Sequence, residues 1–158
     1  MSGLVDLIGK IEAQKASTPV VQATREELLE VERRRTLSHH TQEQCCAALS
    51  LYKLVKRCRD TGGGIRATKF LLGLYNGDRF PFDLTDLRSF DHVQFEAAIL
   101  LLRREHDSRW GEVHTLLNAI LGAGANCGAE FERWAYDLRL PGSCKKHQLP
   151  PLPTVDFR

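Results

Sequence analysis

Apolar residues recur every three or four positions along most of the chain, which is the spacing of amphipathic α-helices. The first stripe is short and consists of Leu4, Leu7, Ile8 and Ile11. The segment 15–21 contains serine, threonine and proline, and it predicts a linker. No segment shows a convincing alternation of apolar and polar residues, as a half-buried β-strand would. The pattern therefore predicts an all-α protein.

Two capping boxes predict where helices begin. Thr24 with Glu27, and Thr41 with Gln44, place a hydroxyl and a polar side chain three residues apart, where both can satisfy free amides at a helix N-terminus. The helix after Thr41 is predicted to run to about Arg59, with a wide apolar face and a basic opposite side.

Three consecutive glycines, Gly62 to Gly64, interrupt the apolar pattern. They predict a hinge between two helices, the second of which spans Ile65 to Tyr75. Asn76 and Gly77 both tolerate positive φ and predict its end.

Two aspartates predict where the next two helical segments begin. Asp83 is expected to cap a short turn over 84–88, and Asp91 to cap a helix from His92 to about His106. That helix is apolar nearly all round in its middle, which predicts the central buried helix of the fold. Two further helices are predicted over 109–121 and 129–138.

The predicted organisation is one compact domain of about six or seven helices, a size that suits 158 residues. Residues 1–22 form an N-terminal helix and linker, 23–139 the helical core domain, and 140–158 a proline-containing tail that is extended or disordered.

The composition indicates which partners and which cellular compartment to expect. The formal net charge is +2, so bulk charge does not predict attraction to nucleic acid or to an anionic membrane. Five cysteines cannot all pair within the chain, which favours a reducing compartment over a disulfide framework. Neither a signal peptide nor a membrane-length apolar run is apparent, so a soluble cytoplasmic protein is expected.

The sequence lacks the motifs for phosphate binding, metal binding and serine catalysis. The glycines are followed by Ile65 and Arg66, where a phosphate-binding P-loop needs lysine and a hydroxyl residue. His92 and Glu96 share a helix face without an evident third metal ligand. The catalytic serine elbow is missing as well. We therefore expect no cofactor and no metal.

Eight basic residues are the predicted partner-binding set. Two of them, Arg79 and Arg88, flank the short turn, and the other six surround the glycines. The full set is Lys53, Lys56, Arg57, Arg59, Arg66, Lys69, Arg79 and Arg88.

One block of residues resembles the signature of a small, uncharacterised proteobacterial family. It comprises Asp60-Thr61-Gly62, Arg66, Phe70-Leu71-Leu72, Tyr75-Asn76 and the run from Phe82 to Leu87, closing at Asp91. The resemblance covers roughly residues 51–134. Members are found on plasmids, integrative elements and prophages, so the resemblance implies an accessory protein of a mobile element, without implying an activity.

The leading hypothesis is a non-enzymatic protein that binds a host protein or complex, as an inhibitor or regulator of host machinery such as a CRISPR–Cas defence complex. One alternative is a nucleic-acid-binding protein that uses the basic face around residues 53–69, although the helix over 65–75 is too apolar to lie in a DNA groove. A second alternative is an enzyme that uses Asp83, Asp86 and Asp91 for acid–base chemistry.

Overall fold

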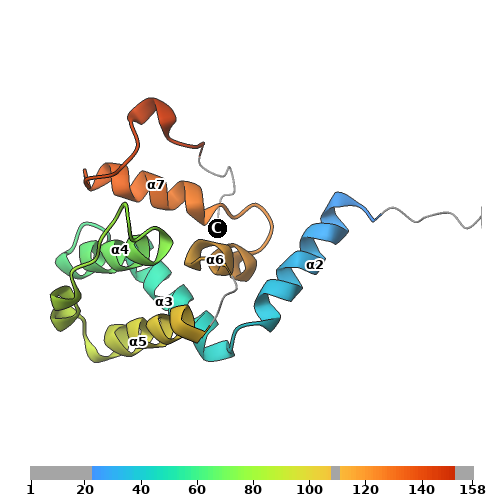
Figure 1. Cartoon of the computed structure of the whole chain (residues 1–158), viewed down its shortest axis with the longest axis horizontal. Coiled ribbons are helices and arrows are strands. Elements are labelled where there is room, and N and C mark those ends of the chain that lie inside the picture. The colour runs from blue at the N-terminus through green and yellow to red at the C-terminus, as the bar shows by residue number, and fades with distance from the viewer. Residues whose placement is uncertain (1–22, 108–110, 152–158) are drawn as a thin grey trace, which may run out of the picture. The chain divides into compact units, whose positions relative to one another are not determined.

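The computed structural model describes residues 23–107 and 111–151, and over these residues the protein is all-α, as predicted, with no β-strand (Figure 1). None of the described helices is long and apolar enough to span a bilayer. The α-helices are α2 (Arg25–Ser38), α3 (Gln42–Cys58), α4 (Gly62–Tyr75), α5 (His92–Asp107), α6 (Val113–Leu121) and α7 (Cys127–Asp137). Two 3₁₀-helices complete the fold, η1 (Leu84–Ser89) and η2 (Lys146–Gln148).

The chain divides into two units, residues 1–30 and residues 31–158, with the boundary inside α2. The second unit holds α3 to α7 and the hydrophobic core. The helix predicted over Leu4 to Ile11 and the linker over 15–21 lie outside the described residues.

Both capping boxes are confirmed. The Thr24 hydroxyl accepts from the Glu27 amide at 3.2 Å, and the Glu27 carboxylate accepts from the Thr24 amide at 2.7 Å. Thr41 and Gln44 make the same reciprocal pair, both at 3.1 Å. The sequence predicted these two starts because each cap is closed by residues three positions apart.

The predicted glycine hinge is wrong. Gly62 to Gly64 form the first turn of α4, capped by the Thr61 hydroxyl, which accepts from the Gly64 amide at 3.1 Å. Gly64 is needed for proximity to α3, because a Cβ on it would overlap the Cys58 carbonyl and lie 3.0 Å from the Cα of Arg59. Helix α4 therefore approaches the end of α3 more closely than a side chain allows.

The end of α4 is confirmed at Tyr75, by another mechanism than positive φ. Asn76 has φ −157°, and its side-chain oxygen accepts from the Arg79 amide at 3.1 Å. The following connector is held by Phe80, which is buried, and by Phe82, whose ring lies edge-on to Phe70 at 5.3 Å.

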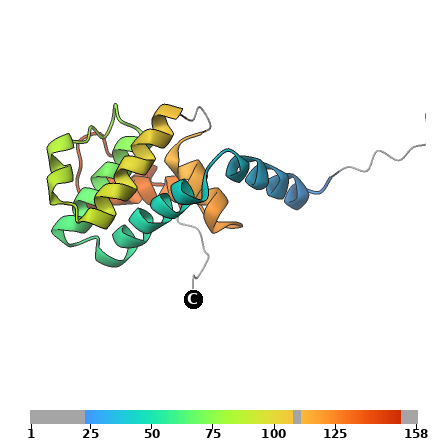
Figure 2. The ribbon, with the colours of Figure 1, turned by 90° about the horizontal axis from the view of Figure 1, so that it is seen from below.

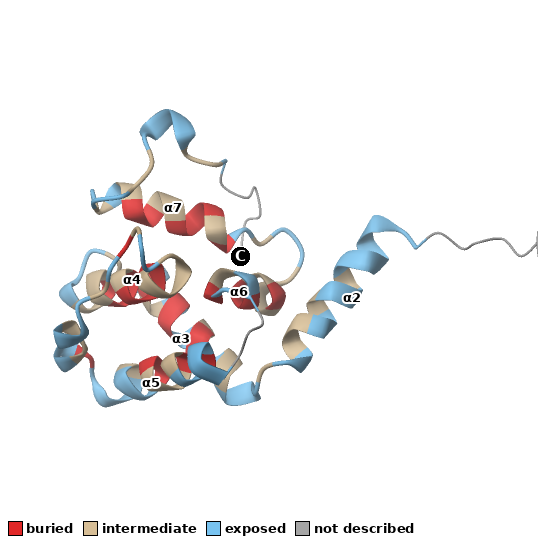
Figure 3. Ribbon diagram, in the orientation of Figure 1, coloured by how far each residue is buried: buried red, intermediate tan, exposed pale blue. Residues whose placement is uncertain are grey.

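Helix α3 is the centre of the bundle. It contacts α4, α5 and α6, and its residues Ala48, Leu51 and Val55 are almost completely buried. Figures 1 and 2 show α3 running behind α4 and beside α5. The prediction that the helix after Asp91 is central is wrong, because α5 buries only one side (Figure 3). Its Val93 is 72% exposed and its Phe95 is 38% exposed.

Helix α6 begins later than predicted. Residues 111–112 are not helical and Glu112 is the N-cap, so α6 starts at Val113 and not at residue 109. Gly111 has φ +70°, a value that glycine adopts without strain. Its carbonyl accepts from the buried Arg104 at 2.8 Å, which fixes the chain just before the helix.

Between the end of α7 and residue 151 the described chain forms turns and the 3₁₀-helix η2, and no further α-helix. The turn at the end of α7 is a Schellman motif, in which the Leu140 amide donates to the Ala135 carbonyl at 3.0 Å and the Arg139 amide to the Tyr136 carbonyl at 2.9 Å. Arg139 occupies the left-handed position of this motif, φ 51°, where glycine is usual.

Gly64→Ala is expected to lower the free energy of unfolding by about 2 kcal/mol or more, because the added methyl group overlaps the α3 backbone. Gly63→Ala is the matched control: no atom lies within 4 Å of its added Cβ, so it should be neutral or stabilising by up to about 1 kcal/mol. Urea unfolding of both variants measures the difference. Equal stability of the two variants would contradict the close approach of α4 to α3.

Candidate partner-binding surface

The eight predicted basic residues do not form one open surface. Four of them pair with acidic residues of α7 or η1 at N–O distances from 2.7 to 3.7 Å: Lys56 with Glu130, Arg59 with Asp137, Arg66 with Asp86, and Arg79 with Glu132. The other four make no ion pair with another described residue; these are Lys53, Arg57, Lys69 and Arg88. Half of the predicted basic set is therefore paired with carboxylates of the same chain, although these four side chains remain 35–46% exposed.

Glu132 on α7 is the centre of one polar network. Arg79 binds it with two hydrogen bonds, of 2.7 and 2.9 Å, and the Tyr75 hydroxyl donates to it at 2.9 Å. The hydrogen bonds from Arg79 hold the pKa of Glu132 below its usual value. Burial, together with the bond to Glu132, raises the pKa of Tyr75 to about 12.

Arg79 also donates to the carbonyl of Gly142, at 3.0 Å from its second terminal nitrogen, and its guanidinium lies 4.7 Å from the Phe80 ring centre. The arginine thus joins the connector after α4 to α7 and to the segment beyond it. Its contacts are structural ones, which differs from the predicted role in a partner contact.

Glu130 is the centre of a second network, between α3 and α7. It is buried, accepts from the Tyr52 hydroxyl at 2.9 Å and pairs with Lys56 at 3.1 Å. Burial and the nearby Glu130 charge raise the pKa of Tyr52 well above its usual value. Because Lys56 compensates a buried carboxylate, removing it would leave that charge unpaired.

The three aspartates of the enzyme hypothesis have separate local partners. Asp83 caps η1 by accepting from the Thr85 amide at 2.8 Å, and the hydrogen bonds from Thr85 keep its pKa below the usual range. Asp91 caps α5 by accepting from the Gln94 amide at 2.7 Å. Asp86 lies 3.7 Å from Arg66. Asp83 and Asp91 thus act as helix caps, and Asp86 forms an ion pair with Arg66.

Metal-binding side chains do not gather within the described residues, where no group of three histidines, cysteines or acids has ligand geometry. All five cysteines are free thiols. Cys127 is buried in the core, and burial raises the pKa of its thiol to about 12, so at neutral pH it is a small apolar side chain.

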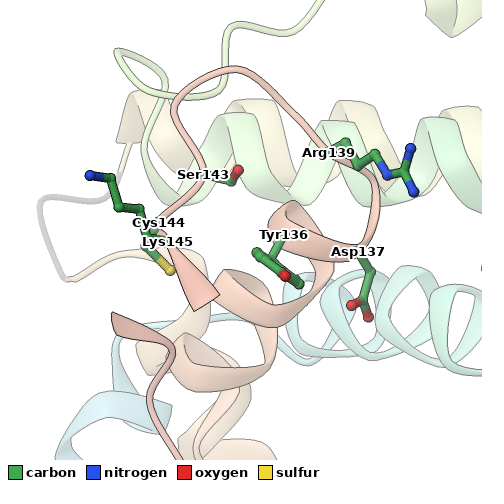
Figure 4. Close-up of a pocket in the computed structure, with 6 residues that line it drawn as sticks. All are labelled: Tyr136, Asp137, Arg139, Ser143, Cys144 and Lys145. Atoms are coloured by element: carbon green, nitrogen blue, oxygen red, sulfur yellow. The ribbon is translucent and has the colours of Figure 1, made fainter. Parts of the chain in front are cut away.

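An open hollow lies beside the end of α7 (Figure 4). The figure shows its two basic side chains, Arg139 and Lys145, pointing to opposite sides, so their charges do not converge on one ligand. Asp137, in the same lining, pairs with Arg59 at 3.3 Å. The hollow is lined by Tyr136, Asp137, Arg139, Ser143, Cys144 and Lys145.

Exposed apolar side chains are the feature that sequence reasoning missed as a site. On α2, no residue is buried, and Leu28, Leu29 and Val31 are 59%, 56% and 64% exposed. A second group, Leu84, Val93 and Phe95, lies on η1 and the first turn of α5. The available signal was the apolar pattern of α2 and α5, which is broader than one buried face requires.

The chain was also compared with known proteins. Residues 46–138, more than half of the chain, match the model of a family of unknown function, DUF7673. No curated protein and no solved structure matches the chain. The matched residues include α4, α5 and α6 and exclude α2.

Glu132→Gln is expected to lower the free energy of unfolding at pH 7 by about 1–3 kcal/mol, because Arg79 loses its charged acceptor. The folded pKa of Glu132 is depressed, so its stabilisation is present above the unfolded value of about 4.3 and is lost as the pH falls through the folded value. The difference between wild type and Glu132→Gln should therefore shrink from pH 6 to pH 3 in urea unfolding.

Tyr75→Phe is the control, since it keeps the Arg79–Glu132 pair. The folded pKa of Tyr75 is raised to about 12, so its stabilisation is present below the unfolded value of about 10 and is lost as the pH rises from there. Tyr75→Phe should remove the loss of stability at alkaline pH and retain most of the loss of stability at acidic pH. A wild-type advantage over Glu132→Gln that is constant with pH would contradict the role of the ion pair.

Proposed function

The chain belongs to the DUF7673 family of unknown function, and from this premise we propose that it is a non-enzymatic protein that acts by binding another protein. The observation that supports this is α2, a helix of 14 residues that buries none of them and exposes three large apolar side chains. Most helices in proteins owe their stability to a packed apolar face, and a helix of this length is marginal alone in water. The C-terminal half of α2 has contacts with the fold, through Leu37 against the core and Arg33, which donates to the Ala119 carbonyl at 2.8 Å. A partner protein would supply the contact that the three exposed side chains lack.

The partner contact that fits is a helix held in an apolar groove, with Leu28, Leu29 and Val31 as its anchors. Each side chain is more than half exposed, so burial by a partner contributes about 1 kcal/mol per residue. Glutamates flank these anchors in α2, at positions 26, 27, 30 and 32. A groove with a basic rim is therefore the better match.

Nucleic acid is the weaker fit. Four of the eight basic residues are paired with carboxylates of the same chain, and α4, the second helix of the basic junction, is largely buried. We extend the proposal to setting and effect: an accessory protein of a mobile element that inhibits or regulates a host complex, such as a CRISPR–Cas defence complex. That extension depends on the resemblance to mobile-element proteins.

Affinity capture of the full chain from a host lysate, with and without nuclease, tests the proposal. Leu28→Glu should reduce recovery of the captured protein at least tenfold, because a charge enters an apolar contact. Arg25→Gln is the matched control, with the same change of net charge on the same helix, and should leave recovery unchanged.

Three outcomes would contradict the proposal. Recovery that depends on intact nucleic acid would favour the nucleic-acid alternative, and salt-sensitive binding to random duplex DNA would support it. Equal loss with Leu28→Glu and Arg25→Gln would show a charge effect and not an apolar contact. A large drop in the free energy of unfolding for Leu28→Glu would show that the residue is covered by its own chain.

A further inference from the structure

Helix α5 carries a second apolar stripe, which runs from the border of its core-facing side to its outer side. Its buried residues, Ala97, Ala98, Leu101 and Arg104, lie on one side of the helix. At roughly 100° per residue, Phe95 and Ile99 point away from that side, and Leu102 lies at its border, where it also packs against the core. Phe95 is exposed, and Ile99 and Leu102 are half-buried.

The stripe has the spacing of a coiled-coil seam. Alternating steps of three and four residues join His92, Phe95, Ile99, Leu102 and His106, which are the a and d positions of two heptads. In a helix, such positions pack against the same kind of seam on another helix. The occupant that suits this surface is therefore a helix.

We propose that the occupant is α5 of a second copy of this chain, in an antiparallel pair around a two-fold axis. Glu96 and Arg103 lie on the same flank of the seam. Both are exposed, and neither is in an ion pair with another residue of the described part of the chain. When Ile99 packs against Leu102 of the second copy, Glu96 faces Arg103 of the second copy. The two-fold axis repeats this ion pair.

The flanking charges select this arrangement over its alternatives. Sliding one helix by one heptad in the antiparallel pair brings Glu96 against Glu96 of the second copy. A parallel pair brings Asp91 against Glu96 of the second copy, again two negative charges. In the proposed register His106 packs against Phe95 of the second copy and closes each end of the seam.

The pair is expected to be weak, because the seam covers only two heptads. One helix pair of this length buries less than the roughly 1,200 Å² of a standard interface, which is the range of transient contacts. Association is expected at protein concentrations on the order of 10–100 µM. The contact is independent of the proposed partner of α2.

Sedimentation equilibrium of the full chain from about 5 to 500 µM tests the proposal. Wild type should change from monomer to dimer over this range. E96R alone and R103E alone should each raise the dissociation constant at least tenfold, because each brings like charges together twice. The double variant E96R/R103E should return to the wild-type value, since it restores both pairs in reversed order.

Mixing the two single variants is the most discriminating experiment. E96R from one copy then faces R103E from the other, and the two unchanged residues face each other, so the mixture should dimerise where each variant alone does not. Circular dichroism and urea unfolding check that each variant is folded, as expected for exposed positions. A monomeric wild type at 500 µM, single variants that associate like wild type, or a mixture that stays monomeric would each overturn the proposal.

Discussion

The close approach of α4 to the end of α3 is the constraint on which the rest of the bundle depends. Gly64 lies so near the Cys58 carbonyl that no side chain fits between them, and the buried Thr68 hydroxyl donates to the Gly64 carbonyl at 2.8 Å. This contact places the apolar face of α4 over α3. Helices α5 and α6 then complete the cover of α3, and α7 is joined to it by the buried Glu130 network. Helix α3 contacts three other helices along its buried face and keeps an exposed face of its own, which carries Lys53, Lys56 and Arg57.

In the folded structure, the residues that stabilise the fold and the residues left on the surface are not those that the linear sequence suggests. Basic residues that look like a binding face, such as Lys56 and Arg79, compensate carboxylates on α7 and so contribute to the fold. Apolar residues that look like core, such as Val93 and Phe95, remain outside it. The account of function therefore moves from charge to apolar contact: α2 and the outer seam of α5 are the surfaces that burial in the fold does not explain.

The sequence predicted what depends on neighbours along the chain. The caps at Thr24, Thr41 and Asp91 were correct, because each is closed by a residue three positions away. The sequence did not predict the features that depend on contacts between residues far apart in the chain. The pairing of Arg79 with Glu132 joins residues 53 positions apart, and the role of Gly64 is visible only when α3 is in place. The sequence of α5 predicts a central helix, but an apolar surface on all sides fits a helix with two separate contacts equally well.

The central claim is that the apolar residues outside the core contact other proteins. Photo-crosslinking in cells, with benzoylphenylalanine in place of Leu28 or Ile99, tests it most directly, and the exposed Lys53 is the control position. The expected result is a crosslink to a different protein from position 28, a crosslink to a second copy of the chain from position 99, and neither product from position 53. Crosslinks from both apolar positions that stay within a single chain would contradict the claim, because the fold itself would then cover these residues.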